Sequence, residues 1–390
     1  MPTDTPDEVG KRIAATRQSR RMTQSALARA SYLSLAMVKS IEGGRRSPSD
    51  ATLESIAAAL GVDASRLVIG HSGTERRVHA ALPELSAVLA AYDIPLGPPR
   101  RTGLELEAAV EEAAGWRLAA QYGRIASGIP ALLQDTLSQL HATGRPEAAR
   151  LVVSAARTAD AVAYKHGAHD LSARLIDLMR WAAARADDPL LTATCAYVRT
   201  ETFFAASAYQ AGLHALEMAV DAAPPPDSSR TAAASGALHM RAAVIAGRAG
   251  DASTAGAHLA TARQLGQRAP EGVYQGTAFG PDSVRIHEVS VAVSLGGDHV
   301  GRALDVAEEW KPPENLPDER RSGFYIELAR AQLWSGLPGD AFESLKVARA
   351  IAPQHTREHP WARADATTLR RLKRADAESL TSFAEWIGAV

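Results

Sequence analysis

The sequence predicts an all-α protein, in which a small N-terminal helical domain precedes a long array of helical hairpins. Three observations predict this fold class. At 390 residues, the chain is too long for one ordinary hydrophobic core. Its apolar residues are mostly Ala and Leu, with only 5% aromatic residues, and Ala allows helix backbones to approach closely. Val and Ile never alternate over the length of a strand.

Residues 1–70 carry the signals of a domain of five short helices. Thr23 can cap the second helix and Ser34 the third, because a hydroxyl oxygen accepts a hydrogen bond from a free N–H group of the first turn. Gly43 and Gly44 supply a left-handed stop after the third helix. A fourth helix and a short fifth turn follow. Apolar residues at helical spacing are expected to form the core: Val9, Ile13, Leu27, Ala28, Val38, Ile41, Leu53, Ile56, Ala57, Leu60 and Leu67.

The second and third helices, joined by a tight turn, describe a helix-turn-helix. Residues 22–28 (Met-Thr-Gln-Ser-Ala-Leu-Ala) and 34–49, which end in Ile-Glu-Gly-Gly-Arg-Arg-Ser-Pro-Ser, resemble the signature of XRE-type repressor domains. The resemblance covers residues 8–69. Tyr32 departs from it, because the family usually has Gly in this turn. The resemblance implies double-stranded operator DNA as a partner.

The resemblance also implies which residues bind DNA. Gln24 would hold a phosphate through its side chain or through a backbone amide of the helix N-terminus. The outward face of the third helix would enter the major groove, with Lys39 as its longest donor, and the arginines after this helix would contact phosphates. Arg17 and Glu42 match a family pair that joins the first helix to the end of the third, so we assign them to structure. The predicted DNA-binding residues are Gln24, Ser34, Leu35, Ala36, Lys39, Ser40, Arg45 and Arg46.

Charge and cysteine content narrow the class of protein further. The net charge is +3 for residues 1–70 and −4 for the rest of the chain, which suits a nucleic-acid-binding module attached to an acidic body. Cys195 is the only cysteine, so an internal disulfide or a multi-cysteine metal site is excluded. No apolar run has the length of a membrane span and the N-terminus is not a secretory signal, so we expect a cytoplasmic protein.

Residues 71–101 are predicted to be a linker with one helix, over 75–92, that Pro83 bends or interrupts. From residue 102 to residue 390 we expect a domain of helical repeats. The pattern Ala-x6-Gly-x4-Ala-x6-Ala, which is the small-residue skeleton of a tetratricopeptide repeat (TPR), begins at Ala243 and again at Ala329.

These repeats are degenerate, because the intervals between them are not uniform. The same repeat pattern can also be matched from Leu137, but that match would divide the helix predicted over 146–166. We therefore interpret it as a chance match. The body resembles the long repeat domains of XRE-type regulators in actinobacteria, most clearly over residues 274–287. The predicted helix pairs are 146–166 with 169–186, 188–206 with 208–223, 231–249 with 252–268, 282–297 with 299–310, and 320–336 with 338–351, followed by a capping pair in 361–388.

Stacked helical hairpins form a concave groove suited to peptides or small ligands. Related arrays in peptide-sensing regulators often clamp a peptide backbone with Asn side chains. The only Asn here is Asn315, in a Pro-rich loop, which disfavours a peptide, although Arg, Gln and Tyr can also bind a backbone. The candidate ligand-binding residues are Trp181, Tyr197, Arg199, His239, Arg241, Arg285, His287 and Tyr325.

We find no residue pattern typical of a catalytic or metal site, so we expect no enzyme, no metal and no cofactor. The sequence therefore predicts a homodimeric transcriptional regulator that binds operator DNA and responds to a small molecule or peptide. The alternative is a TPR-type scaffold for a protein partner, in which DNA binding is secondary.

Overall fold

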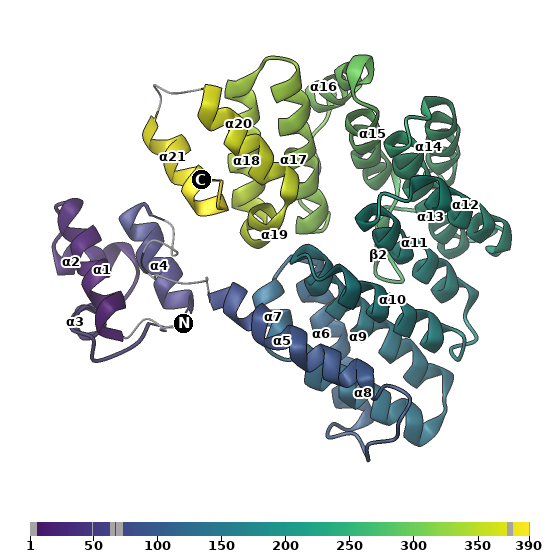
Figure 1. Ribbon diagram of the computed structural model, residues 1–390, viewed down its shortest axis with the longest axis horizontal. Helices are drawn as coiled ribbons and strands as arrows, with labels where there is room; N and C mark the ends of the chain where they lie inside the picture. Colours follow the sequence, from purple (N-terminus) through teal and green to yellow (C-terminus); the bar gives the residue numbers. More distant parts are fainter. Residues whose placement is uncertain (1–5, 49, 63–66, 68–72, 373–376, 390) are drawn as a thin grey trace.

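The computed structural model describes residues 6–48, 50–62, 67, 73–372 and 377–389. Figure 1 shows a small N-terminal domain beside a long, curved body of paired helices. The helices of the N-terminal domain are α1 Pro6–Ser19, α2 Gln24–Ala30, α3 Leu35–Glu42 and α4 Asp50–Leu60. The helices of the body are α5 Gly73–Ala90, α6 Gly103–Leu118, α7 Tyr122–Ala126, α8 Ile129–Thr143, α9 Pro146–Lys165, α10 His169–Ala183, α11 Pro189–Ala205, α12 Tyr209–Ala222, α13 Ser229–Arg248, α14 Ala252–Gly266, α15 Pro281–Leu295, α16 Val300–Glu309, α17 Asp318–Trp334, α18 Pro338–Ile351, α19 Pro353–Glu358, α20 Pro360–Leu372 and α21 Ala377–Ile387.

Local capping signals set the helix ends of the N-terminal domain as predicted. The Thr23 hydroxyl accepts a hydrogen bond from the backbone N–H of Ala26 at 3.0 Å, and the Ser34 hydroxyl accepts one from Met37 at 3.1 Å. The predicted core residues are buried, except that Leu53 is partly buried against them. The predicted fifth turn lies outside the described residues, apart from Leu67, which is fully buried.

The helix pairs of the body are confirmed, because each predicted helix is present with both ends within three residues of the prediction. One prediction was wrong. The match that begins at Leu137 is a true helical hairpin, in which α8 ends at the left-handed Gly144 and α9 begins at Pro146. The small residues of its second helix, Ala149 and Ala156, are fully buried. The turn that the repeat pattern places at Gly144 therefore precedes α9 and leaves this helix whole.

One element departs from the all-α prediction. Strands β1 Gly272–Tyr274 and β2 Thr277–Phe279 pair antiparallel between α14 and α15, with Val273 opposite Ala278. Gln275 and Gly276 form the turn with φ angles of 47° and 74°, the sign that tight hairpin turns require. In Figure 1, β2 lies inside the curve of the body. Sequence periodicity missed this hairpin because each strand is only three residues long.

The helix predicted within residues 71–101 is present as α5, and it continues through Pro83 rather than ending there. Its buried residues Val78, Leu85 and Leu89 belong to the same hydrophobic core as the helices from α6 to α15. In the described part of the chain, no helix is both long enough and apolar enough to cross a membrane.

Candidate DNA-binding and ligand sites

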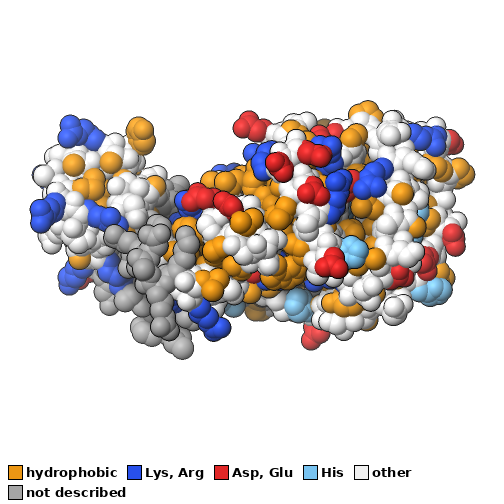
Figure 2. All heavy atoms as spheres, turned by 90° about the horizontal axis from the view of Figure 1, so that it is seen from above, with side chains coloured by type: hydrophobic (Ala, Val, Ile, Leu, Met, Phe, Trp, Pro, Cys, Tyr) orange, Lys and Arg blue, Asp and Glu red, His pale blue; other side chains and the backbone are white. Residues whose placement is uncertain are grey.

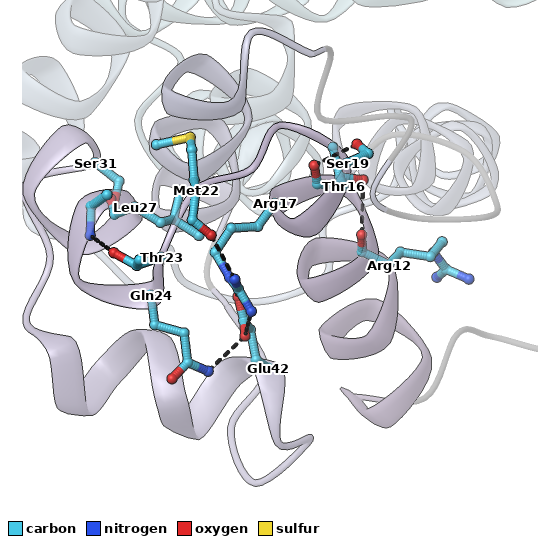
Figure 3. Close-up of polar contacts among 11 residues, drawn as sticks. Arg12, Thr16, Arg17, Ser19, Met22, Thr23, Gln24, Leu27, Ser31 and Glu42 are labelled. Carbon is cyan, nitrogen blue, oxygen red and sulfur yellow. Dashed lines mark hydrogen bonds and ion pairs between the residues drawn. The ribbon is translucent and has the colours of Figure 1, made fainter.

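A buried ion pair joins α1 to the end of α3, as Figure 3 shows. The Arg17 guanidinium donates from Nε to Oε1 of Glu42 at 2.7 Å and from Nη2 to Oε2 at 2.9 Å. Its Nη1 donates to the carbonyl oxygen of Met22 at 2.8 Å. The hydrogen bond to Glu42 raises the pKa of Arg17. The predicted structural role of this pair is confirmed, and the pair fixes the position of α3 relative to α1.

The side chain of Gln24 belongs to the same network (Figure 3). Its amide nitrogen donates to Oε2 of Glu42 at 2.7 Å, a contact that sequence reasoning missed. The side chain therefore anchors the start of α2 to the ion pair. We predicted that Gln24 holds a phosphate through its side chain or through a backbone amide. Only binding through the backbone amide leaves the hydrogen bond from Gln24 to Glu42 intact.

The other predicted DNA-binding residues lie on or next to one exposed face of α3. Leu35, Ala36 and Lys39 are exposed, whereas Val38 and Ile41 on the opposite face are fully buried. Ser34 caps the helix and Ser40 is half-buried, so neither offers a long donor. Arg45 and Arg46 are exposed in the loop after α3. Figure 2 shows Lys and Arg side chains predominating on the N-terminal domain in that view, and both signs mixed over the body.

Tyr32 stands in the turn between α2 and α3 with a φ angle of 56°, and its side chain is 97% exposed. A left-handed backbone costs a residue with a Cβ about 1 kcal/mol or more, and Gly avoids this cost. We expect Tyr32→Gly to stabilise the N-terminal domain by about 1 kcal/mol, measured by hydrogen exchange of the α2 and α3 amides. Tyr32→Ala removes the ring but keeps the strain, so a comparable gain from Tyr32→Ala would contradict this explanation.

The body contains a polar cavity of ≈ 550 Å³, lined by residues from α6, α9 to α13, α15 and α17 and from residues 355–363. Three of the predicted ligand residues line it, namely Tyr197, Arg241 and His287. Most of its charged residues were not predicted from the sequence. They include Arg117, Arg157, Asp160, Glu201, Arg320 and Glu327.

The other five predicted ligand residues lie outside this cavity, and each packs against a neighbouring side chain. The ring of Trp181 meets the ring of Tyr92 edge-on, with 5.1 Å between the ring centres, and Tyr325 packs on Phe324. The guanidinium of Arg199 lies over the ring of Phe203, and that of Arg285 lies over Trp310. His239 meets His258, with their Nδ1 atoms 2.9 Å apart. Helical spacing placed these residues on helices of the array but not on the face that lines the cavity, so they take no part in the site proposed below.

The turn of the β-hairpin is bonded to the cavity wall by two arginines. Arg157 on α9 donates to the carbonyl oxygen of Gln275 at 2.7 Å and to the hydroxyl of Thr277 at 2.8 Å. Arg117 on α6 donates to the carbonyl oxygen of Gly276 at 3.0 Å. The hairpin therefore ties the segment between α14 and α15 to helices more than 100 residues earlier in the chain.

Tyr197 lies between two further arginines of the cavity. Nη2 of Arg320 donates to its hydroxyl at 2.6 Å, and the guanidinium of Arg241 lies 4.5 Å from the centre of its ring. The guanidinium of Arg241 also faces Glu201, with 3.9 Å between its Nη2 and Oε1 of the carboxylate. Two cations therefore converge on one side chain that lines the cavity.

Burial in this cavity shifts the ionisation of its side chains. Loss of hydration lowers the pKa of Arg157 to about 9 and that of His287 to about 3. The same effect raises the pKa of Glu327 to about 7 and that of Asp160 well above its ordinary value. These shifts mark the cavity as a place where isolated charge is costly.

The raised pKa of Glu327 predicts a dependence of stability on pH. The folded protein holds this proton up to about pH 7, whereas the unfolded chain releases it near pH 4.5, so stability falls as the pH rises between these values. Glu327→Gln keeps an acceptor for the Ser290 hydroxyl and never ionises. We expect it to raise the free energy of unfolding by about 3 kcal/mol at pH 8 and by less than about 0.5 kcal/mol at pH 4.5. The exposed Glu308→Gln is the control, and equal effects of both variants would refute the prediction.

Comparison with known proteins identifies the N-terminal domain. Residues 13–67 match the helix-turn-helix family model. An immunity repressor protein from Bacillus phage phi105 is 45% identical over 60 residues, which are 15% of this chain and 42% of the repressor. The chain thus spans less than half the length of this curated relative. The N-terminal domain is therefore a helix-turn-helix domain of the XRE type.

Two solved structures are similar to larger parts of the chain, at low identity. PlcR of Bacillus thuringiensis, in complex with the peptide PapR7 and DNA, has a TM-score of 0.29 and 14% identity, covering 67% of this chain and 95% of that one. The apo form of the competence regulator ComR from Streptococcus vestibularis has a TM-score of 0.28 and 12% identity, covering 96% of this chain and 99% of that one.

Proposed function

We propose that this chain is a DNA-binding transcriptional regulator whose helical body binds an effector in the central cavity. The observation that carries the proposal is the helix-turn-helix match over residues 13–67, together with the exposed face of α3. The buried Arg17–Glu42 pair holds that helix in a fixed orientation, which insertion into a major groove requires. The polar cavity in the body supports an effector site, because buried ionisable groups cluster at binding sites.

We also propose that the regulator acts as a homodimer. Two copies related by a twofold axis would present two α3 helices to successive major grooves about 34 Å apart. This arrangement compensates for the shortage of polar donors on α3, where Leu35 and Ala36 can contact only the methyl group of a thymine. A footprint with two protected half-sites, one helical turn apart, supports the dimer, and a single half-site argues against it.

The test of DNA binding uses the full chain and DNA selected from a random library or taken from upstream of its own gene. We expect the affinity to fall steeply between 50 and 200 mM salt, because phosphate contacts release counterions. Arg45→Ala and Arg46→Ala should each lower the slope of log affinity against log salt by about one, whereas Lys39→Ala should cost about 1–3 kcal/mol of binding free energy.

Arg268→Ala, an exposed arginine on the body, is the matched control and should bind DNA like the wild type. An affinity that does not depend on salt would remove DNA from the proposed function. If Lys39→Ala and the two loop variants bind as tightly as the control, the assignment of α3 and its following loop is wrong.

A further inference from the structure

Four arginines of the central cavity lack a carboxylate partner within ion-pair distance in the described chain. They donate instead to neutral oxygens or to a hydroxyl: Arg117 to Gly276, Arg157 to Gln275, Arg248 to Ser294 and Arg320 to Tyr197. A neutral acceptor satisfies an N–H group but leaves the charge uncompensated. A buried cation without a counter-charge costs several kcal/mol. The cavity therefore holds an excess of positive charge.

Burial disfavours the charged form of two acidic side chains in the cavity. Burial raises the pKa of Asp160 well above its ordinary value, and the negative charge of Glu201 nearby raises it further. Burial also raises the pKa of Glu327 to about 7, so about half of this group is neutral at that pH.

Two more carboxylates already have cations of their own. Glu319 pairs with Lys165 at 3.0 Å, and Glu358 pairs with Arg363 at 2.7 Å. Glu201 lies within ion-pair distance of one of the cavity arginines, 3.9 Å from Arg241. The lining as a whole has six arginines and one lysine against four glutamates and one aspartate, so its formal charge is positive.

Unsatisfied polar atoms mark the place that a ligand would occupy. Nε of Arg117, Nε of Arg241 and Oε2 of Glu201 are buried and have no hydrogen-bond partner among the described residues. Buried donors and acceptors are almost always satisfied in native proteins. These atoms offer two donors on cations and one acceptor, and they line the same cavity as the two arginines that converge on Tyr197.

We propose that the cavity binds a compact oxyanion with two or more negative charges, held by Arg117, Arg241 and Arg320, with a hydroxyl of the ligand directed to Glu201. The inference rests on the proposed function in that it treats the cavity as the effector site. A volume of ≈ 550 Å³ suits a small molecule. Such a ligand would supply the counter-charge that the buried arginines lack.

The test is calorimetric titration of the full chain with citrate and with pyrophosphate, at constant ionic strength set with sodium chloride. We expect saturable binding of at least one of the two and a matching rise in the melting temperature. Binding of citrate alone identifies a carboxylate effector, and binding of pyrophosphate alone a phosphate effector. Glucose, which is neutral, should not bind. Absence of saturable binding by both anions overturns the proposal.

Substitution of the cavity arginines tests where the anion binds. Arg241→Gln and Arg320→Gln should each lower the affinity for the anion by about tenfold. Substitution of the exposed Arg268 by Gln should leave this affinity unchanged. Both cavity variants reduce the repulsion between buried cations, so they should remain folded, and circular dichroism checks this. If the double variant Arg241→Gln/Arg320→Gln binds the anion as tightly as the wild type, the proposal is overturned. Because no step uses DNA, a negative result here leaves the DNA-binding proposal standing.

Discussion

Arg17→Ala is expected to destabilise the N-terminal domain by about 3–5 kcal/mol and to abolish its binding to DNA. The substitution leaves the Glu42 carboxylate buried without its partner, and it also removes the donor to the carbonyl oxygen of Met22. The ionic link between α1 and α3 is then lost, and the apolar contacts between them remain. Since α3 carries the exposed face assigned to DNA, loss of this contact at its C-terminal end is expected to disturb the orientation of that face.

The measurement is hydrogen exchange of the full chain, because it separates the opening of the N-terminal domain from the opening of the body. Amides of α1 to α3 should lose protection in Arg17→Ala, while those of α9 and α13 should not. Arg29→Ala, an exposed arginine on α2, is the matched control. The double variant Arg17→Met/Glu42→Leu should regain most of the stability, since an apolar pair can replace a buried ion pair. Equal protection in Arg17→Ala and Arg29→Ala would refute the role given to the pair.

The N-terminal domain could be predicted in detail because its signals are local. A cap such as Thr23 or Ser34 acts within three residues of itself, so the sequence alone shows where each helix begins. The strain at Tyr32 was visible as a departure from the Gly of the family pattern. The hydrogen bond from Gln24 to Glu42 was not visible, because it joins residues 18 positions apart on different helices.

The helices of the body could also be predicted, but the residues that line the cavity could not. Helical periodicity shows which face of a helix is buried without showing whether it meets a neighbouring helix or a cavity. Arg157 and Asp160 on α9 illustrate the signal that was missed. Both stand in the buried, Ala-rich stretch of that helix, at positions where an apolar core would have an apolar residue. Charged residues inside an apolar face were the available evidence for a polar cavity.

The second large effect is expected from Gly236→Ala on α13, which should destabilise the body by about 3 kcal/mol. A Cβ atom at this position would lie 2.0 Å from Cζ of Phe279, a distance that real contacts do not allow. Phe279 is fully buried on β2, so it can yield only if the strand moves. Movement of the strand would draw the hairpin turn away from Arg157 and Arg117 in the cavity.

Chemical denaturation of the full chain measures this effect, and Gly256→Ala on α14 is its matched control. A Cβ atom at Gly256 meets nothing within 4 Å, so the same substitution there should be neutral or stabilising by up to about 1 kcal/mol. Phe279→Leu should relieve the clash, so Gly236→Ala should cost less in that background than in the wild type. If the two Gly→Ala variants behave alike, or if the two effects simply add, the hairpin is not held by this contact. The absence of a side chain at position 236 is therefore the condition for Phe279 to pack on α13, and through it for the hairpin turn to reach the buried arginines.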